Sequence, residues 1–149
     1  MGGRRADRLV ILVLSLLIVA VGTGCGKKGD PLPPDVVLPA AAHDLRIGKD
    51  AESIRVSWLL PERERDIRRI VIQRSEFQTV LDRCPDCPQD FRILADLPPG
   101  DPRFDRTEGR GMAYLDRDIR SGRLYMYRII VCNGGGACSD PSMTVELKY

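Results

Sequence analysis

Histidine is nearly absent from this sequence, since His43 is the only one in 149 residues. Nucleophilic sites built from Ser–His or Cys–His pairs need an imidazole beside the nucleophile, and His43 lies in a proline- and alanine-rich stretch that offers no such partner. Carboxylates are plentiful, but those of residues 101–118 alternate with arginines. That mixture is typical of a solvated, ion-paired surface. The sequence therefore predicts no catalytic residue, no metal site and no cofactor.

An excess of charge of one sign is also missing. The chain has 23 Lys and Arg against 21 Asp and Glu. Because residues 1–24 hold Arg4, Arg5, Arg8 and Asp7, the remainder carries 20 charges of each sign. Binding to nucleic acid depends on a strong positive footprint. We therefore expect no nucleic-acid partner.

Long apolar runs are lacking after the N-terminus. The longest run, residues 9–21, has 13 residues with Ser15 as its one polar member, and it follows the three arginines. A helix that spans a bilayer usually needs about 20 apolar residues, so this run is short for a permanent anchor. A positive segment followed by a short apolar helix is typical of an export signal; a signal anchor is the alternative.

A single cysteine, Cys25, follows the apolar run in the stretch VGTGCGKKGDPLPP. The small residues 22–24 provide a cleavage site, and a cysteine directly after them resembles the lipobox of bacterial lipoproteins. It departs from that motif at Gly22, where the family prefers an aliphatic residue. The resemblance implies a signal peptide over residues 1–24 and acylation of Cys25. An ordinary secretory signal is the alternative, but removing Cys25 leaves four cysteines, which can all pair.

The stretch after Cys25 is rich in proline and small residues up to His43. Such chain is extended and semi-rigid, so we interpret residues 25–43 as a lipidated tether. Two or three acyl chains would hold it stably on membrane lipid. By resemblance to known lipoprotein sorting rules, Gly26 in place of Asp implies the outer membrane. The opening CGKKGDPLPP also resembles very small outer-membrane lipoproteins, one of which assists maturation of the lipopolysaccharide export machine.

Residues 44–149 alternate apolar and polar side chains in short segments separated by turn residues, and they show no convincing helix. Alternation with a period of two predicts half-buried strands. The predicted strands are residues 44–48, 54–58, 67–75, 90–97, 112–116, 124–132 and 143–147. About seven short strands predict an all-β fold, an antiparallel immunoglobulin-like sandwich.

Three segments of this part resemble the fibronectin type III domain. They are the pattern Ile54-x-Val56-x-Trp58-x-x-Pro61, the corner segment of residues 119–129 (IRSGRLYMYRI), and the final turn NGGGACSDPS of residues 133–142. The corner segment resembles the family pattern Leu-x-Pro-Gly-x-x-Tyr-x-Tyr-Arg-Val. Ser121 replaces the usual proline of the corner. The resemblance implies that Trp58, Tyr125 and Tyr127 are core residues. It further implies that the Tyr125 hydroxyl donates a hydrogen bond to backbone near residues 119–122.

Four cysteines remain, in the motifs Cys84-Pro-Asp-Cys87 and Cys132-Asn-Gly-Gly-Gly-Ala-Cys138. A four-cysteine zinc site, a redox-active Cys-x-x-Cys and two structural disulfides are the alternatives. In a sandwich of the fibronectin type III kind the two motifs lie at opposite ends, too far apart for a shared disulfide or site. We therefore favour the local bonds Cys84–Cys87 and Cys132–Cys138.

These features together predict an envelope lipoprotein with a non-catalytic binding or scaffolding module and an envelope protein as partner. The 133–137 loop and the 98–111 connection are the candidate contact regions, because both are long or flexible enough to adapt. A structural spacer in an outer-membrane assembly complex and a thiol-redox accessory protein are the alternatives.

Overall fold

The structure, a computed structural model, describes residues 38–62, 66–82 and 87–149. The expected signal helix, Cys25, most of the expected tether and Cys84 lie outside these residues. Among the described residues no helix is long and apolar enough to cross a membrane.

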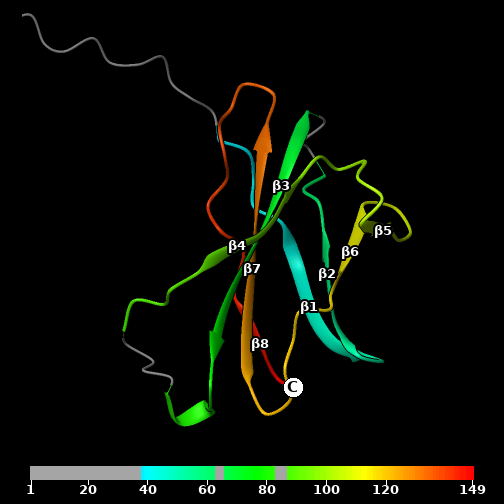
Figure 1. Ribbon diagram of the computed structural model, residues 1–149. Helices are drawn as coiled ribbons and strands as arrows, with labels where there is room; N and C mark the ends of the chain where they lie inside the picture. The colour runs from blue at the N-terminus through cyan, green and yellow to red at the C-terminus, as the bar shows by residue number, and fades with distance from the viewer. Residues whose placement is uncertain (1–37, 63–65, 83–86) are drawn as a thin grey trace, which may run out of the picture. The chain divides into compact units, whose positions relative to one another are not determined.

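The described residues form two antiparallel sheets that face each other (Figure 1). The elements are β1 (His43–Asp50), β2 (Ser53–Leu59), β3 (Ile67–Phe77), the short 3-10 helix η1 (Val80–Asp82), β4 (Arg92–Leu97), β5 (Phe104–Arg106), β6 (Gly111–Asp116), β7 (Leu124–Asn133) and β8 (Val145–Lys148). One sheet has the order β1-β2-β6-β5 and the other the order β4-β3-β7-β8. The predicted all-β sandwich is thus confirmed, with one addition, β5. That strand has three residues, too few for an alternation to be recognised.

The core lies between the sheets because alternate side chains of the central strands point inward. Trp58 is 2% exposed, and Tyr125 and Tyr127 are fully buried. The other fully buried core side chains are Ile54, Val56, Ile70, Ile72, Ile129 and Val131. Trp58 also meets Phe104 edge to face, with ring centroids 5.8 Å apart. The residues that carried the resemblance to fibronectin type III domains therefore fill the centre of this sandwich.

The N-terminal side of the sandwich includes residues that we expected in the tether. Pro39 and Ala42 are buried, and Ala42 belongs to the core cluster. β1 begins at His43, whose exposed ring lies 3.3 Å from a carboxylate oxygen of Asp44. The segment before β1 therefore packs on the sandwich.

The last strand begins later than predicted. β8 starts at Val145, and Met143 is 86% exposed. Upstream of it, Pro141 interrupts the backbone ladder because proline has no N–H. The hydroxyls of Ser139 and Ser142 accept hydrogen bonds from the N–H groups of Val131 and Ile129, at 3.2 and 2.9 Å. Side chains thus replace backbone acceptors beside the proline.

Replacing Ala51 with glycine is expected to stabilise the domain by about 0.5–1 kcal/mol. Ala51 and Glu52 form the two-residue turn between β1 and β2, and Ala51 has a φ of 50°, a conformation that disfavours residues with a Cβ. Urea unfolding of Ala51→Gly measures the gain. Gly48→Ala is the matched control: φ there is ordinary and an added Cβ meets nothing within 4 Å, so alanine should be the better residue. An unfolding free energy of Ala51→Gly below that of the wild type would show that the positive φ of Ala51 does not strain the backbone.

Candidate functional site

The candidate site lies at the end of the sandwich where β3 leaves the apolar core. The inward positions of β3 pass from Ile70 and Ile72 to Arg74 and Glu76, because alternation continues beyond the core. Arg74 lies opposite Tyr127 of β7 in the sheet register. A charged side chain therefore points between the two sheets.

Arg74 forms a buried pair with Asp116, the last residue of β6. The Arg74 Nη1 donates to Asp116 Oδ2 at 2.8 Å, and the side chains are 15% and 1% exposed. The Tyr127 hydroxyl donates to the same oxygen at 2.7 Å, and the Asp118 N–H donates to Asp116 Oδ1 at 3.0 Å. Both oxygens of this buried carboxylate are thus hydrogen-bonded, as burial of a charge requires.

The pKa values of Tyr127 and Arg74 in this cluster are raised above their ordinary values. Burial, together with the negative charge of Asp116, raises the pKa of Tyr127 above its ordinary value. For Arg74, burial acts to lower the pKa, but the hydrogen bond and charge of Asp116 outweigh it and raise the pKa further. Near neutral pH Tyr127 is therefore a proton donor in a hydrogen bond, and Arg74 is a fixed cation. The arrangement ties one sheet to the other, and near neutral pH Tyr127 and Arg74 both keep their protons.

Stability should fall at alkaline pH, and Tyr127→Phe should reduce that fall. Because the pKa of Tyr127 is higher in the folded state than the unfolded value of about 10, its contribution is present below pH 10. It is lost as pH rises toward the folded-state pKa, by up to about 1.4 kcal/mol per pH unit. Urea midpoints between pH 8 and 11 measure the slope. The pKa values of Tyr114 and Tyr125 are also raised by burial, so part of the slope should persist in Tyr127→Phe; an unchanged slope would be inconsistent with the assignment.

Around the buried pair lies a rim of more exposed charged partners, since the side chains of Asp118, Glu76 and Arg123 are 85%, 28% and 29% exposed. Arg74 Nη2 also donates to a carboxylate oxygen of Asp118 at 3.1 Å, and it lies 3.7 Å from Glu76. Arg123 forms an ion pair with Glu76. The Arg74 guanidinium lies 5.5 Å from the ring centre of Tyr125. The rim therefore continues the buried pair outward as alternating charges.

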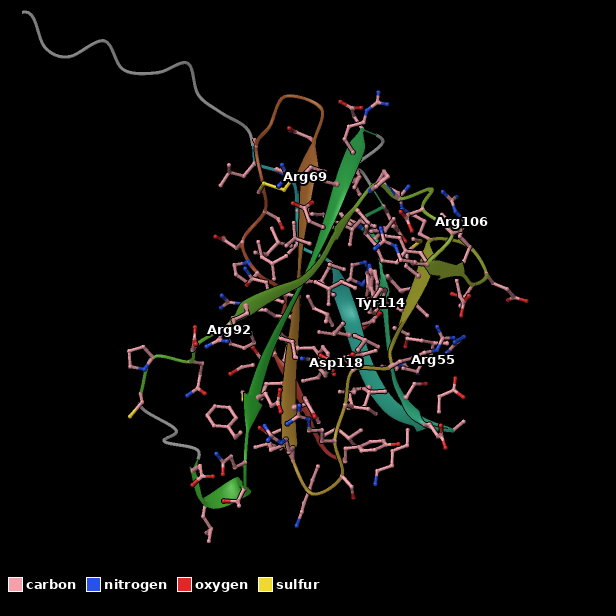
Figure 2. All side chains as sticks on the ribbon, viewed as in Figure 1. Arg55, Arg69, Arg92, Arg106, Tyr114 and Asp118 are labelled. Atoms are coloured by element: carbon pink, nitrogen blue, oxygen red, sulfur yellow. A yellow bond between two sulfur atoms is a disulfide. The ribbon has the colours of Figure 1, made fainter. Side chains whose placement is uncertain are left out.

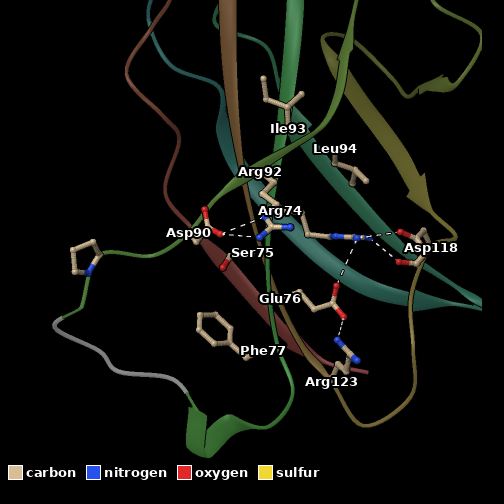
Figure 3. A pocket seen from close by; sticks show the side chains of 11 residues that line it. Arg74, Ser75, Glu76, Phe77, Asp90, Arg92, Ile93, Leu94, Asp118 and Arg123 are labelled. Carbon is tan, nitrogen blue, oxygen red and sulfur yellow. Dashed lines mark hydrogen bonds and ion pairs between the residues drawn. The ribbon is translucent and has the colours of Figure 1, made fainter.

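A groove with a volume of about 570 Å³ opens beside this rim (Figure 3). It is lined by Arg74, Ser75, Glu76, Phe77, Pro88, Asp90, Arg92, Ile93, Leu94, Asp118 and Arg123. We call it the β3 groove. Its volume lies within the range of ligand-binding pockets.

Outside the groove, which Arg92 and Asp90 help to line, the charged side chains are scattered. Figure 2 shows Arg55, Arg69, Arg92 and Arg106 spread over the domain. The first three are ion-paired, with Asp105, Asp96 and Asp90 in that order. Paired, separated charges of this kind are typical of a solvated surface.

The predicted hydrogen bond between the Tyr125 hydroxyl and the backbone near residues 119–122, known as a tyrosine corner, is present but runs in the opposite direction. The Tyr125 hydroxyl accepts a hydrogen bond from the N–H of Arg120 at 2.7 Å. The sequence predicted this stretch of backbone as the partner but assigned the hydroxyl as donor. It accepts because the nearby backbone group that it meets is an N–H.

The cysteine motifs differ in what the structure describes. Cys132 and Cys138 form the predicted disulfide, with Cα atoms 4.0 Å apart. Cys87 is disulfide-bonded as well, and its predicted partner Cys84 lies outside the described residues. The first motif follows β3 and the second follows β7, at opposite ends of these paired strands. Within the described ranges, no group of three or more His, Cys, Asp or Glu side chains is placed to hold a metal ion.

Asp116 and Arg74 are the site residues that sequence reasoning missed. Asp116 was interpreted as one of the solvated carboxylates of residues 101–118, and this was wrong: it is 2% exposed. Its neighbours Asp101 and Asp105 do form exposed ion pairs, with Arg103 and Arg55. A signal was present, since Arg74 continues the inward alternation of Ile70 and Ile72.

No protein-family model matches the sequence, and no curated protein matches it. Solved structures do match. A Fn3-like protein from Clostridium thermocellum is 16% identical with a TM-score of 0.51, over 76% of this chain and 95% of that chain. The twitchin kinase region from C. elegans is 16% identical with a TM-score of 0.54, over 75% of this chain and 17% of that one. Astrotactin-2 is 16% identical with a TM-score of 0.53, over 78% of this chain and 23% of its own.

These similarities establish the fold. The Fn3-like protein is matched over almost its whole length, whereas the chain spans less than a quarter of the twitchin and astrotactin chains. The domain is thus a fibronectin type III-like sandwich, as the three sequence segments predicted. Fold does not identify a ligand.

Proposed function

We propose that this chain is an envelope lipoprotein, anchored through an acylated Cys25, whose fibronectin type III-like domain is a non-catalytic binding or scaffolding module. Residues 1–24 would be the signal peptide and residues 25–43 the lipidated cysteine and tether, with Pro39 and Ala42 already packed on the domain. Gly26 favours the outer membrane. The partners are then membrane lipid and an envelope protein.

One observation carries the binding role. The buried ionisable groups of the candidate site satisfy one another: Arg74 and Tyr127 both donate to Asp116. Catalytic sites instead hold groups with pKa values tuned to their task. The β3 groove beside this closed cluster is open to a ligand, which favours recognition over chemistry.

The cysteine count supports the anchor. The chain has five cysteines; Cys132 is bonded to Cys138, and Cys87 is also in a disulfide. One cysteine is left over. In an oxidising compartment a free thiol is reactive, so we expect the fifth cysteine to be modified or to have a separate function. Acylation of Cys25 supplies that role if Cys87 pairs with Cys84.

Replacing Cys25 with serine is expected to release the protein from membranes. The wild-type chain should fractionate with membranes and show the mass of two or three acyl chains, because the thiol is the acylated group. Cys25→Ser should lose both properties. A Cys84→Ser, Cys87→Ser double variant is the control and should remain membrane-bound; a wild-type chain without added lipid mass would disprove the anchor.

The partner is tested by photo-crosslinking in intact cells. A crosslinker at exposed Ile93 beside the β3 groove and a second one at Ala137 in the 133–137 loop sample two faces of the domain. We expect a discrete crosslinked band from at least one position, and the same band in cells that carry the Cys84→Ser, Cys87→Ser variant. Loss of the band in that variant would favour the thiol-redox alternative. No band from either position would contradict a binding role.

The spacer alternative rests on where the chain enters and leaves the sandwich. β1 begins at His43, opposite Leu59, and ends at Asp50, opposite Ser53. The Tyr149 hydroxyl donates to the carbonyl of Ala51, in the turn that follows Asp50. His43 and Tyr149 thus lie near opposite ends of β1, an arrangement that suits a spacer. Exchange of the domain for an unrelated fibronectin type III domain distinguishes the roles, since a spacer would keep its function and a binding module would lose it.

A further inference from the structure

One side of β3 is only partly paired. β7 pairs with β3 along its whole length, from Ile67 to Phe77. β4 pairs only with residues 70–74. In the described part of the chain no strand and no backbone hydrogen bond occupies the β4 side of residues 75–77. We call these three residues the open edge.

Among the described residues, the main-chain groups on the β4 side of the open edge have no backbone partner. The N–H and C=O of a strand residue point to the same side, and successive residues alternate. At least one of the three residues must therefore direct both groups away from β7. Unpaired strand edges of this kind are templates for an added strand.

Space for an added strand is available at this place. The β3 groove is lined by all three residues of the open edge and also by Pro88, Asp90 and the first residues of β4; Figure 3 shows Asp90 and Arg92 beside β3. Strands in a sheet lie about 4.7–4.9 Å apart. A strand paired with residues 75–77 would therefore lie in the groove.

We propose that the open edge binds an extended, uncharged peptide segment of a partner protein, which adds to the sheet as a short strand beside β3. This rests on the proposed binding function and assigns it a site and a class of ligand. In such recognition the main chain supplies affinity, and alternate side chains supply specificity.

The charges of the groove favour an uncharged segment. Three arginines and three carboxylates line it, and each is already paired. The pairs are Arg74 with Asp118, Arg123 with Glu76, and Arg92 with Asp90. A charged peptide side chain would therefore find no unpaired opposite charge among these six residues, and an uncharged one leaves the pairs intact.

The two faces of the open edge predict an alternating peptide. Glu76 lies opposite Tyr125, whose ring is in the core, so it faces inward toward Arg123. Ser75 and Phe77 face the other side of the sheet, where Ile93 is 62% exposed. A peptide residue opposite Glu76 should be polar and its two neighbours apolar.

The neighbouring part of the same edge is protected. The pairing of β3 with β4 is irregular between Ile72 and Gln73, and Asp96 of β4 forms an ion pair with Arg69. Bulges and edge charges discourage added strands. Docking should therefore stop where β4 begins.

Selection from a displayed library of random heptapeptides on the full chain in detergent tests the proposal. Enriched peptides should be uncharged, with a polar residue between two apolar ones, and should bind Ile93→Arg at least tenfold more weakly than wild type. Met143→Arg is the matched control, since Met143 is 86% exposed and precedes β8 on the far side of the same sheet; binding should stay within twofold. N-methylation of the amides of an enriched peptide, one at a time, should weaken binding tenfold at alternate positions.

Four results would overturn the open edge: no enrichment, enrichment of charged peptides, tolerance of every N-methylation, or a loss confined to Met143→Arg. Failure here is distinct from failure of the binding role. If the Ala137 crosslinker captures a partner while the library gives any of these results, the domain binds elsewhere. If neither crosslinking position captures a partner, the binding role itself fails.

Discussion

Replacing Asp116 with alanine is expected to destabilise the domain by about 3 kcal/mol. The substitution removes the acceptor of the Arg74 and Tyr127 hydrogen bonds and leaves both donors between the sheets. Breaking a buried ion pair costs about 3–5 kcal/mol. The lower end applies because Arg74 keeps the carbonyl and carboxylate of Asp118. Urea unfolding followed by the fluorescence of Trp58, the single tryptophan, measures the change.

Two controls separate burial from charge. Asp105→Ala removes a carboxylate that is 53% exposed and paired with Arg55, so the loss should stay within about 1 kcal/mol. A triple variant, Asp116→Leu with Arg74→Met and Tyr127→Phe, replaces the whole cluster with apolar groups and should be more stable than Asp116→Ala alone. Equal losses of unfolding free energy in Asp116→Ala and Asp105→Ala would show that the buried pair stabilises the domain no more than an exposed pair does.

The cluster also explains why the groove can be open without weakening the fold. Arg74 reaches from β3 to Asp116 on the facing sheet, so the end of the sandwich is closed by polar contacts where apolar packing stops. β3 keeps its strand geometry past the last residue that β4 covers because β7 pairs with it as far as Phe77. A sheet edge held in place before a ligand arrives costs less ordering on binding than a flexible loop does.

The strands were predictable from local pattern where burial alternates. Ile54, Val56 and Trp58 share one buried face of β2, and that face is visible in the sequence because its period is two. The Cys132–Cys138 bond was predictable for a similar reason, since a short glycine-rich turn brings both ends together. Local spacing determines such features, and no knowledge of the rest of the chain is needed.

The site depends on long-range pairing, which a local pattern does not encode. Asp116 has arginine and aspartate neighbours in sequence, and its burial follows from the contact with Arg74, which lies 42 residues earlier. The open edge depends on where β4 stops along β3. Strand alternation predicts which face a residue takes, but it does not predict how far two strands overlap.

Replacing Trp58 with alanine is expected to have the largest effect, about 3–5 kcal/mol. Trp58 is 2% exposed in the central strand β2 and packs edge to face on Phe104. Truncation removes that contact and leaves a cavity between the sheets. Domains of this size are stable by about 5–15 kcal/mol, so we expect the variant to lose a large fraction of its stability. Circular dichroism in urea measures the loss, because the variant has no tryptophan to report by fluorescence.

Trp58→Phe is the matched comparison. The indole Nε1 of Trp58 is buried and has no hydrogen-bond partner among the described residues, so phenylalanine keeps an aromatic ring against Phe104 and also removes an unpaired donor. We expect a loss of about 1–2 kcal/mol, well below that of the alanine variant. If both variants lost the same stability, the retained phenyl ring would contribute no packing against Phe104, and the central position of Trp58 in the core would have to be reconsidered.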